Sequence, residues 1–245
     1  MDRAPPRDRS PGRCRRAPRA GSGRTLTRVV VTQASPGARR TVDRLRREGI
    51  DAVACPLIRT AAVEGGRVRA EGYDWLVLTS RVAVEELFRR LEGELPRVAV
   101  VGRGTAEALR GHGVEPALVA SISTQEGLVA ALPKPAGRVL FAGAEGARPV
   151  IVRELAAEFV PLYRTIERRP ERFPDADLVV LASGSAARSF AALGHDLPCV
   201  SIGPQTSAEA RRHGLRVVAE AESQDADGLV QAVKLAASRI ASSRS

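Results

Sequence analysis

The sequence predicts an α/β fold in which two doubly wound parallel-sheet lobes are joined by a two-stranded connector. Three observations lead to this prediction. Short apolar runs alternate with helical stretches, several segments occur twice in the same order, and one repeated segment, PLIRT or PLYRT, does not fit the alternation. Alternation of strands and helices is typical of parallel sheets that are covered by helices on both faces.

Six short runs rich in Val, Leu and Ile have the composition of buried parallel strands. These runs lie at residues 29–31, 76–78, 98–101, 138–141, 178–181 and 199–202. Helical stretches that begin with small or polar residues alternate with them, at residues 36–48, 82–91, 105–111, 186–193 and 206–212.

Four pairs of segments indicate that the chain contains two diverged copies of one unit. The pairs are VVVTQASPGARR (29–40) with VLFAGAEGARPV (139–150), PLIRT (56–60) with PLYRT (161–165), YDWLVLTSRVAVEELF (73–88) with ADLVVLASGSAARSF (176–190), and VAVVGRGTAEALRGHGV (98–114) with VSIGPQTSAEARRHGL (200–215). A helical tail with a Gly-Leu pair follows each copy, GLVAAL at 127–132 and GLVQAV at 228–233.

The PLIRT and PLYRT segments are predicted to be exposed connecting strands, because an initial proline and a polar Arg-Thr end are poor material for a central strand. The chain would then leave the first lobe at 56–60 and return at 161–165. The predicted units are a disordered tail at 1–25, a first lobe at 26–54 plus 168–240, connector strands at 55–61 and 159–167, and a second lobe at 62–158. A tandem division near 120–135 is the alternative, but it would place a linker inside a strand–helix alternation.

The first 25 residues differ in composition from the rest, with eight Arg, four Pro and three Gly. Such a segment cannot bury enough apolar surface to fold, so we expect a disordered tail or an incorrectly assigned translation start. Its eight Arg against Asp2 and Asp8 account for +6 of the formal charge of +10, which leaves +4 for the remainder. That mild excess suits an anionic ligand and does not require nucleic acid.

Several classes of protein are excluded by composition. No apolar run approaches the roughly 18–20 residues that a membrane-spanning helix needs. Three distant cysteines without a C-x-x-C pair suit a reducing cytoplasm, and three histidines without ligand spacing predict no metal site.

Four motifs taken together resemble the uroporphyrinogen-III synthase family, over about residues 26–236. They are DWLVLTS (74–80), VGRGTAEAL (101–109), VPLYRT (160–165) and IGPQTSAEA (202–210). The resemblance implies a lyase without a cofactor that closes the linear hydroxymethylbilane to uroporphyrinogen III, with inversion of the last pyrrole ring and loss of water. It also implies two flavodoxin-like lobes tied by a two-stranded ladder, with the active site between them. We expect a cytoplasmic monomer with no membrane or nucleic-acid partner.

A substrate with many carboxylates needs a cleft rich in anion-binding groups, which the turns after parallel strands can supply. Helix N-termini there present unpaired amides, and glycine allows close approach of the backbone. The predicted substrate-binding residues are Thr79, Ser80, Arg81, Gly102, Thr105, Ser183, Ser185, Gly203 and Thr206. Alternatively, Thr105 and Thr206 only cap their own helices.

Tyr163 is the predicted catalytic residue. The resemblance places it at the family's connector tyrosine, where a neutral phenol could protonate the departing hydroxyl. Its counterpart in the first copy is Ile58, so a single lobe presents the phenol. Alternatively, Tyr163 is a linker residue packed against a lobe. The stretch before PLYRT is about five residues shorter than its counterpart.

Two other hypotheses remain at this point. A non-catalytic sensor of a tetrapyrrole or another polyanion would have the same fold. Nucleic-acid binding through the arginine tail is the second, although the predicted lobes show no stripe of aromatic and basic residues.

Overall fold

The computed structural model describes residues 27–242, which form two large sheets. The five-stranded sheet has the spatial order β13 (Val217–Glu220), β12 (Cys199–Ser201), β11 (Leu178–Leu181), β1 (Arg28–Val31) and β2 (Asp51–Ala54). The six-stranded sheet has the order β3 (Ile58–Ala62), β10 (Glu158–Glu167), β9 (Val139–Ala144), β5 (Trp75–Leu78), β7 (Arg97–Val100) and β8 (Leu118–Val119). A small third sheet pairs β4 (Val68–Arg69) with β6 (Leu91–Glu92). The predicted tail at 1–25 lies outside the described residues.

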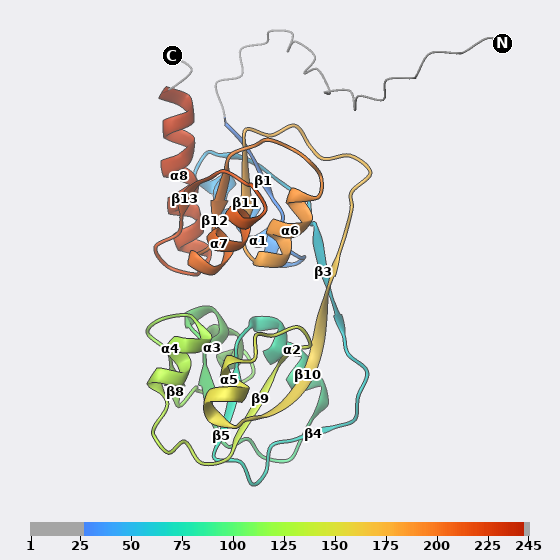
Figure 1. Cartoon of the computed structure of the whole chain (residues 1–245), viewed down its shortest axis with the longest axis vertical. Helices are drawn as coiled ribbons and strands as arrows, with labels where there is room; N and C mark the ends of the chain where they lie inside the picture. Colours follow the sequence, from blue (N-terminus) through green and yellow to red (C-terminus); the bar gives the residue numbers. More distant parts are fainter. Residues whose placement is uncertain (1–26, 243–245) are drawn as a thin grey trace, which may run out of the picture.

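Every neighbouring pair of strands in the two large sheets is parallel except β3 with β10. The prediction of an α/β fold with mostly parallel sheets is therefore confirmed. Figure 1 shows the elements gathered around the two sheets, with β3 and β10 running from one group of elements to the other.

Helices cover both faces of each sheet, because successive strand residues point to opposite faces and all are apolar. On the five-stranded sheet, α1 (Gly37–Arg47) and α8 (Ala226–Ser242) pack over Val29 and Val31, whereas α6 (Gly184–Ala191) and α7 (Pro204–Arg212) pack over Val30. On the six-stranded sheet, α2 (Arg81–Arg90) and α3 (Arg103–Arg110) cover one face, and α4 (Gln125–Ala131) and α5 (Val150–Leu155) cover the other. Burial of each such Val or Leu side chain contributes about 1.5–3 kcal/mol to folding.

The two copies of the repeat exchange parts between the sheets. In the first copy, β1, α1 and β2 belong to the five-stranded sheet, and the elements from β5 to α4, except β6, belong to the six-stranded sheet. The second copy does the reverse, because β9, α5 and β10 complete the six-stranded sheet and β11 to α8 complete the five-stranded one. Each sheet therefore joins segments that lie far apart in the sequence.

The expectation that PLIRT and PLYRT are exposed holds for Arg59, Arg164 and Thr165 and was wrong for the apolar residues of the two segments. Leu57 and Leu162 are fully buried, and Ile58 and Tyr163 are nearly so. Strand β10 also lies inside the six-stranded sheet, between β3 and β9. The proline is tolerated there because the β9–β10 register shifts between Pro161 and Tyr163, so the missing N–H falls at an irregular point of the ladder.

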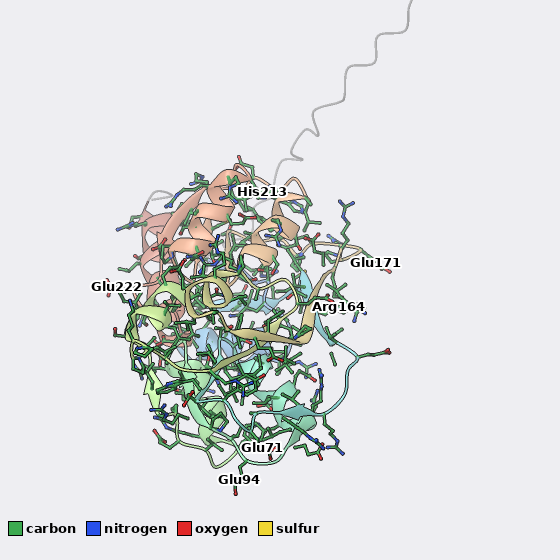
Figure 2. The ribbon with its side chains drawn as sticks, turned by 60° about the horizontal axis from the view of Figure 1, so that its bottom comes forward. Glu71, Glu94, Arg164, Glu171, His213 and Glu222 are labelled. Carbon is green, nitrogen blue, oxygen red and sulfur yellow. The ribbon has the colours of Figure 1, made fainter. Side chains whose placement is uncertain are left out.

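Burial changes abruptly along β10, where the consecutive residues Leu162 and Tyr163 are buried and Arg164 and Thr165 are exposed. Tyr163 packs into the core beneath α2, and the next residue, Arg164, is exposed and is labelled beside the connecting strands in Figure 2. The shortening before PLYRT is found in the preceding helix, because α5 has 6 residues and its counterpart α1 has 11.

Within residues 27–242, no helix is both long and apolar enough to span a bilayer.

Candidate active site

A cavity of about 400 Å³ lies between turns of the two sheets. The turns after β5 and β7 and the start of α4 supply one wall, and the turns after β11, β12 and β13 supply the other. These turns follow the carboxyl ends of parallel strands, where open α/β sheets bind ligands. Because both copies of the repeat contribute, the cavity depends on how the two sheets face one another.

The structure brings five of the predicted residues together and leaves the other five off the cavity wall. Those that line the cavity are Thr79, Arg81, Gly102, Thr105 and Thr206. Those that do not line it are Ser80, Tyr163, Ser183, Ser185 and Gly203.

Helices α3 and α7 begin in the same way on opposite walls. Their N-caps are Gly102 and Gly203, and neither helix has a side-chain hydrogen bond at its cap. Thr105 and Thr206 line the cavity from these two helices, and their role, ligand binding or helix capping, stays a prediction. The first amides of α3 stay available for an anion, as helix N-termini allow. A side chain at Gly102 would bring a Cβ to 2.4 Å from the Ser123 hydroxyl oxygen, so glycine permits this close approach.

Ser80 links the predicted catalytic tyrosine to the cavity rim. It is the N-cap of α2 and accepts a hydrogen bond of 3.0 Å from the Ala83 N–H. The Ser80 Oγ also lies 2.9 Å from the Tyr163 hydroxyl, and its sequence neighbours Thr79 and Arg81 line the cavity. Tyr163 is 9% exposed, and this burial raises the pKa of its phenol, opposed by the hydrogen bond with Ser80. The phenol therefore remains neutral at physiological pH.

Ser183 occupies the corresponding place at the start of α6. It accepts a hydrogen bond of 3.2 Å from the Ala186 N–H, and its hydroxyl oxygen lies 3.1 Å from that of Ser185. The counterpart of Tyr163, in the first copy, is the apolar, buried Ile58, which has no hydroxyl to offer. The two serines thus pair with each other.

Three arginines make one wall of the cavity positive. Arg81 pairs with Glu107 at 2.6 Å, and Arg148 donates two hydrogen bonds to Glu126. These bonds from Arg148 lower the pKa of Glu126 to about 2. Both arginines therefore already have a carboxylate partner.

Arg103 is the third arginine, and it forms no ion pair with any residue of the part of the chain that the structure describes. Its charge acts on Asp225, which follows the cavity residue Gln224 in the sequence. Burial raises the pKa of Asp225, but hydrogen bonds from the Gly228 N–H and the Ser223 hydroxyl and the charge of Arg103 hold it below its usual range. Arg103 is the cavity arginine best placed to receive a carboxylate from a ligand.

Sequence reasoning missed Arg103, Gln125 and Arg148, all of which line the cavity. Arg103 stands inside the predicted turn, directly after Gly102, and its place in the motif could have revealed it. Gln125 and Arg148 come from α4 and from the segment before α5, and no local pattern distinguishes them from surface residues. Within residues 27–242, no cluster of His, Cys, Asp and Glu side chains is arranged to hold a metal ion.

Comparison with known proteins agrees with this fold and with the repeated turns. The chain is 31% identical over 199 residues to uroporphyrinogen-III synthase from Synechococcus elongatus, which covers 66% of this chain and 75% of that protein. The structure is similar to that of uroporphyrinogen-III synthetase from Helicobacter pylori, with a TM-score of 0.60 and 15% identity over 86% of this chain and 99% of the other.

A mutant uroporphyrinogen III synthase from Thermus thermophilus gives a TM-score of 0.58 at 17% identity, over 87% of this chain and 100% of the other. At this level of identity, the two solved structures support the fold alone. The family model described as uroporphyrinogen-III synthase HemD matches residues 39–231. The chain belongs to the uroporphyrinogen-III synthase family.

Proposed function

We propose that this protein closes hydroxymethylbilane to uroporphyrinogen III, with inversion of the last pyrrole ring and release of water. The observation that supports this most directly is the cavity between the two sheets, in which arginines and an open helix N-terminus face repeated turns of the other copy. A linear tetrapyrrole with many carboxylates suits such a site. The reaction class is that of a cyclising hydro-lyase, and the proposed chemistry needs no cofactor.

The proposed architecture is that of two flavodoxin-like lobes, at residues 26–54 plus 168–240 and at 62–158. Numbered in chain order within its own lobe, the five-stranded sheet has the strand order 2-1-3-4-5, which is the flavodoxin order. The six-stranded sheet has the order 3-2-1-4-5 with β3 added at one edge, and it matches the flavodoxin order when β9 and β10 are counted first, as the repeat aligns them with β1 and β2. The segments 55–61 and 159–167 would connect the lobes, and two strands leave their relative angle free to change. We propose a cytoplasmic monomer that acts on a free substrate.

Tyr163 is the proposed general acid. It protonates the hydroxyl of the terminal hydroxymethyl group as the C–O bond breaks, so that water leaves and an electrophilic azafulvene remains. The raised pKa keeps the proton on the phenol until that step. Ser80, 2.9 Å away, connects the phenol to the turn whose residues Thr79 and Arg81 line the cavity.

The remaining steps exchange carbon–carbon bonds without further reagents. The substituted carbon of the last ring attacks the azafulvene and gives a spiro intermediate. That intermediate fragments at its other carbon–carbon bond, and the released ring recloses through its free carbon and loses a proton. Because hydroxymethylbilane closes unaided to the uninverted isomer, the protein must chiefly hold the chain in the inverting shape. Such orientation can contribute about 7–11 kcal/mol.

The decisive experiment separates the isomers formed from enzymatically made hydroxymethylbilane. We expect uroporphyrinogen III with the protein and isomer I without it. Formation of isomer I alone would contradict the proposal and leave a binding protein of the same fold. A sample of the protein unfolded by heat is the control for spontaneous closure.

A further inference from the structure

Gln125 differs from the other polar side chains on the cavity wall. It is 9% exposed, and its amide oxygen is buried without a hydrogen-bond partner among residues 27–242. A buried acceptor without a donor destabilises the protein that contains it. Because Gln125 also lines the cavity, a ligand can supply the missing donor.

The second copy of the repeat has no equivalent of this side chain. Aligning the turns through Gly127 and Gly228 places Ala226 opposite Gln125. Ala226 can begin α8 just as Gln125 begins α4. The start of the helix therefore does not require a glutamine. No contact among residues 27–242 gives the amide oxygen of Gln125 a structural role.

The ligand group that suits this acceptor can be identified by chemistry. An ionised carboxylate only accepts hydrogen bonds, so the acidic arms of a tetrapyrrole cannot satisfy the Gln125 oxygen. A pyrrole N–H donates in the plane of its ring, and the same ring carries carboxylate arms. Arg103 and the free amides at the start of α3 lie on the same wall and suit those arms.

We propose that the Gln125 amide oxygen accepts a hydrogen bond from a pyrrole N–H of the bound tetrapyrrole and thereby fixes the orientation of one ring. This inference rests on the proposed function. Gln125 is thus a specificity-determining residue, since ring orientation decides which isomer forms.

The test is Gln125→Met, which keeps the length of the side chain and removes the acceptor. We expect KM for hydroxymethylbilane to rise about tenfold and the share of isomer I to increase, as for the loss of one hydrogen bond. The melting temperature should stay equal or rise, because an unpaired buried group is removed. Gln231→Met, an exposed glutamine on α8, is the matched control and should keep wild-type KM and isomer ratio.

Two results would overturn the inference while leaving the proposed function intact. The first is wild-type KM and isomer ratio in Gln125→Met. The second is a lowered melting temperature with unchanged kinetics, which would make Gln125 a structural residue. If the wild-type protein itself formed no isomer III, the proposed function would fail and the inference with it.

Discussion

The turn that contains Ser80 and the turn that contains Ser183 are copies of one structure, and they have diverged in what their hydroxyls contact. Each serine caps its helix through the N–H three residues later. The second contact of the Ser80 hydroxyl is the phenol of Tyr163, whereas that of the Ser183 hydroxyl is the hydroxyl of Ser185. The cap, which folding requires, is the same in both copies, and the hydroxyl's second contact differs between them. The chemistry is therefore expected on one side of the cavity only.

The cavity walls show the same contrast in charge. Arg103 follows Gly102 on one wall, and Pro204, which has no N–H, follows Gly203 on the other. Thr124 caps α4, and the corresponding position before α8 is the carboxylate Asp225. Anionic groups are thus attracted to the wall of the six-stranded sheet. Duplicated backbone geometry can hold two electrostatically different surfaces.

The largest effect is expected where the two copies remain alike. A Cβ at Gly127 would lie 2.2 Å from the Ile122 carbonyl oxygen, and one at Gly228 would lie 2.1 Å from that of Ser223. Each Gly→Ala substitution should lower the free energy of unfolding by about 3 kcal/mol, measured by urea denaturation. Gly66→Ala, where a Cβ meets open space, is the control. A loss of unfolding free energy in only one of the two variants would show that the two copies are not equivalent at this glycine.

The next largest effect is expected on kcat, from the phenol hydroxyl of Tyr163, which its counterpart Ile58 lacks. Tyr163→Phe should lower kcat about 30-fold, because the proposed general acid is lost and substrate orientation is kept. Single-turnover conversion of hydroxymethylbilane measures it. Tyr73→Phe is the matched control, since the Tyr73 hydroxyl bonds Glu158 at the opposite end of the sheet. A wild-type kcat in Tyr163→Phe would show that the turns at Ser80 and Ser183 do not differ in their chemical role.

The charge contrast between the walls predicts a smaller effect. Arg103→Gln should raise KM about tenfold at low salt, because a charge-assisted contact to a carboxylate is lost. The difference from wild type should shrink as salt screens the interaction. Arg39→Gln, on the exposed surface of α1, should leave KM unchanged. Equal KM values in Arg103→Gln and wild type would show that the positive wall does not select the ligand.

The smallest effect is a pH dependence of stability on that same wall. Arg148 lowers the pKa of Glu126 to about 2 from 4.5, so the pair's contribution is complete above pH 4.5 and is lost as the pH falls toward 2. Since both side chains are largely exposed, about 0.5 kcal/mol is expected. The difference in unfolding free energy between wild type and Glu126→Gln should vanish across this range. A difference that persists at pH 2 would argue against the ion pair, and Glu94→Gln serves as an exposed control.

The fold could be predicted from the sequence wherever local chemistry determines it. The run 178–181 is β11 without change, and the predicted helix 82–91 is α2 shifted by one residue. Ser80 could be recognised because a capping serine acts on its own helix. The two repeated glycines were noticed as a Gly-Leu pattern, and the structure gives the reason, which is contact with a carbonyl group of the preceding turn.

The rest of the site depends on contacts between distant segments. Arg148 meets Glu126 only because α4 and α5 pack on one face of the sheet. The burial of Leu57 was not predicted because the neighbouring proline suggested an edge, whereas Leu57 packs into the core of the five-stranded sheet with Val30 and Phe190. Polar residues such as Gln125 give no sign in the sequence of whether they will find a partner.

The exchange of parts between the two copies also has a consequence for protein synthesis. Strand β1, the first strand among residues 27–242, pairs with β11, as the register of Val30 with Val179 shows. This edge of β1 therefore stays unpaired until the last third of the chain has been made. The six-stranded sheet is complete once Glu167 has left the ribosome, and the five-stranded sheet only after Glu220. Pairing across so long a separation slows folding and leaves apolar strands uncovered meanwhile. The segment from β1 to β2 is therefore the part of the nascent chain that most needs protection.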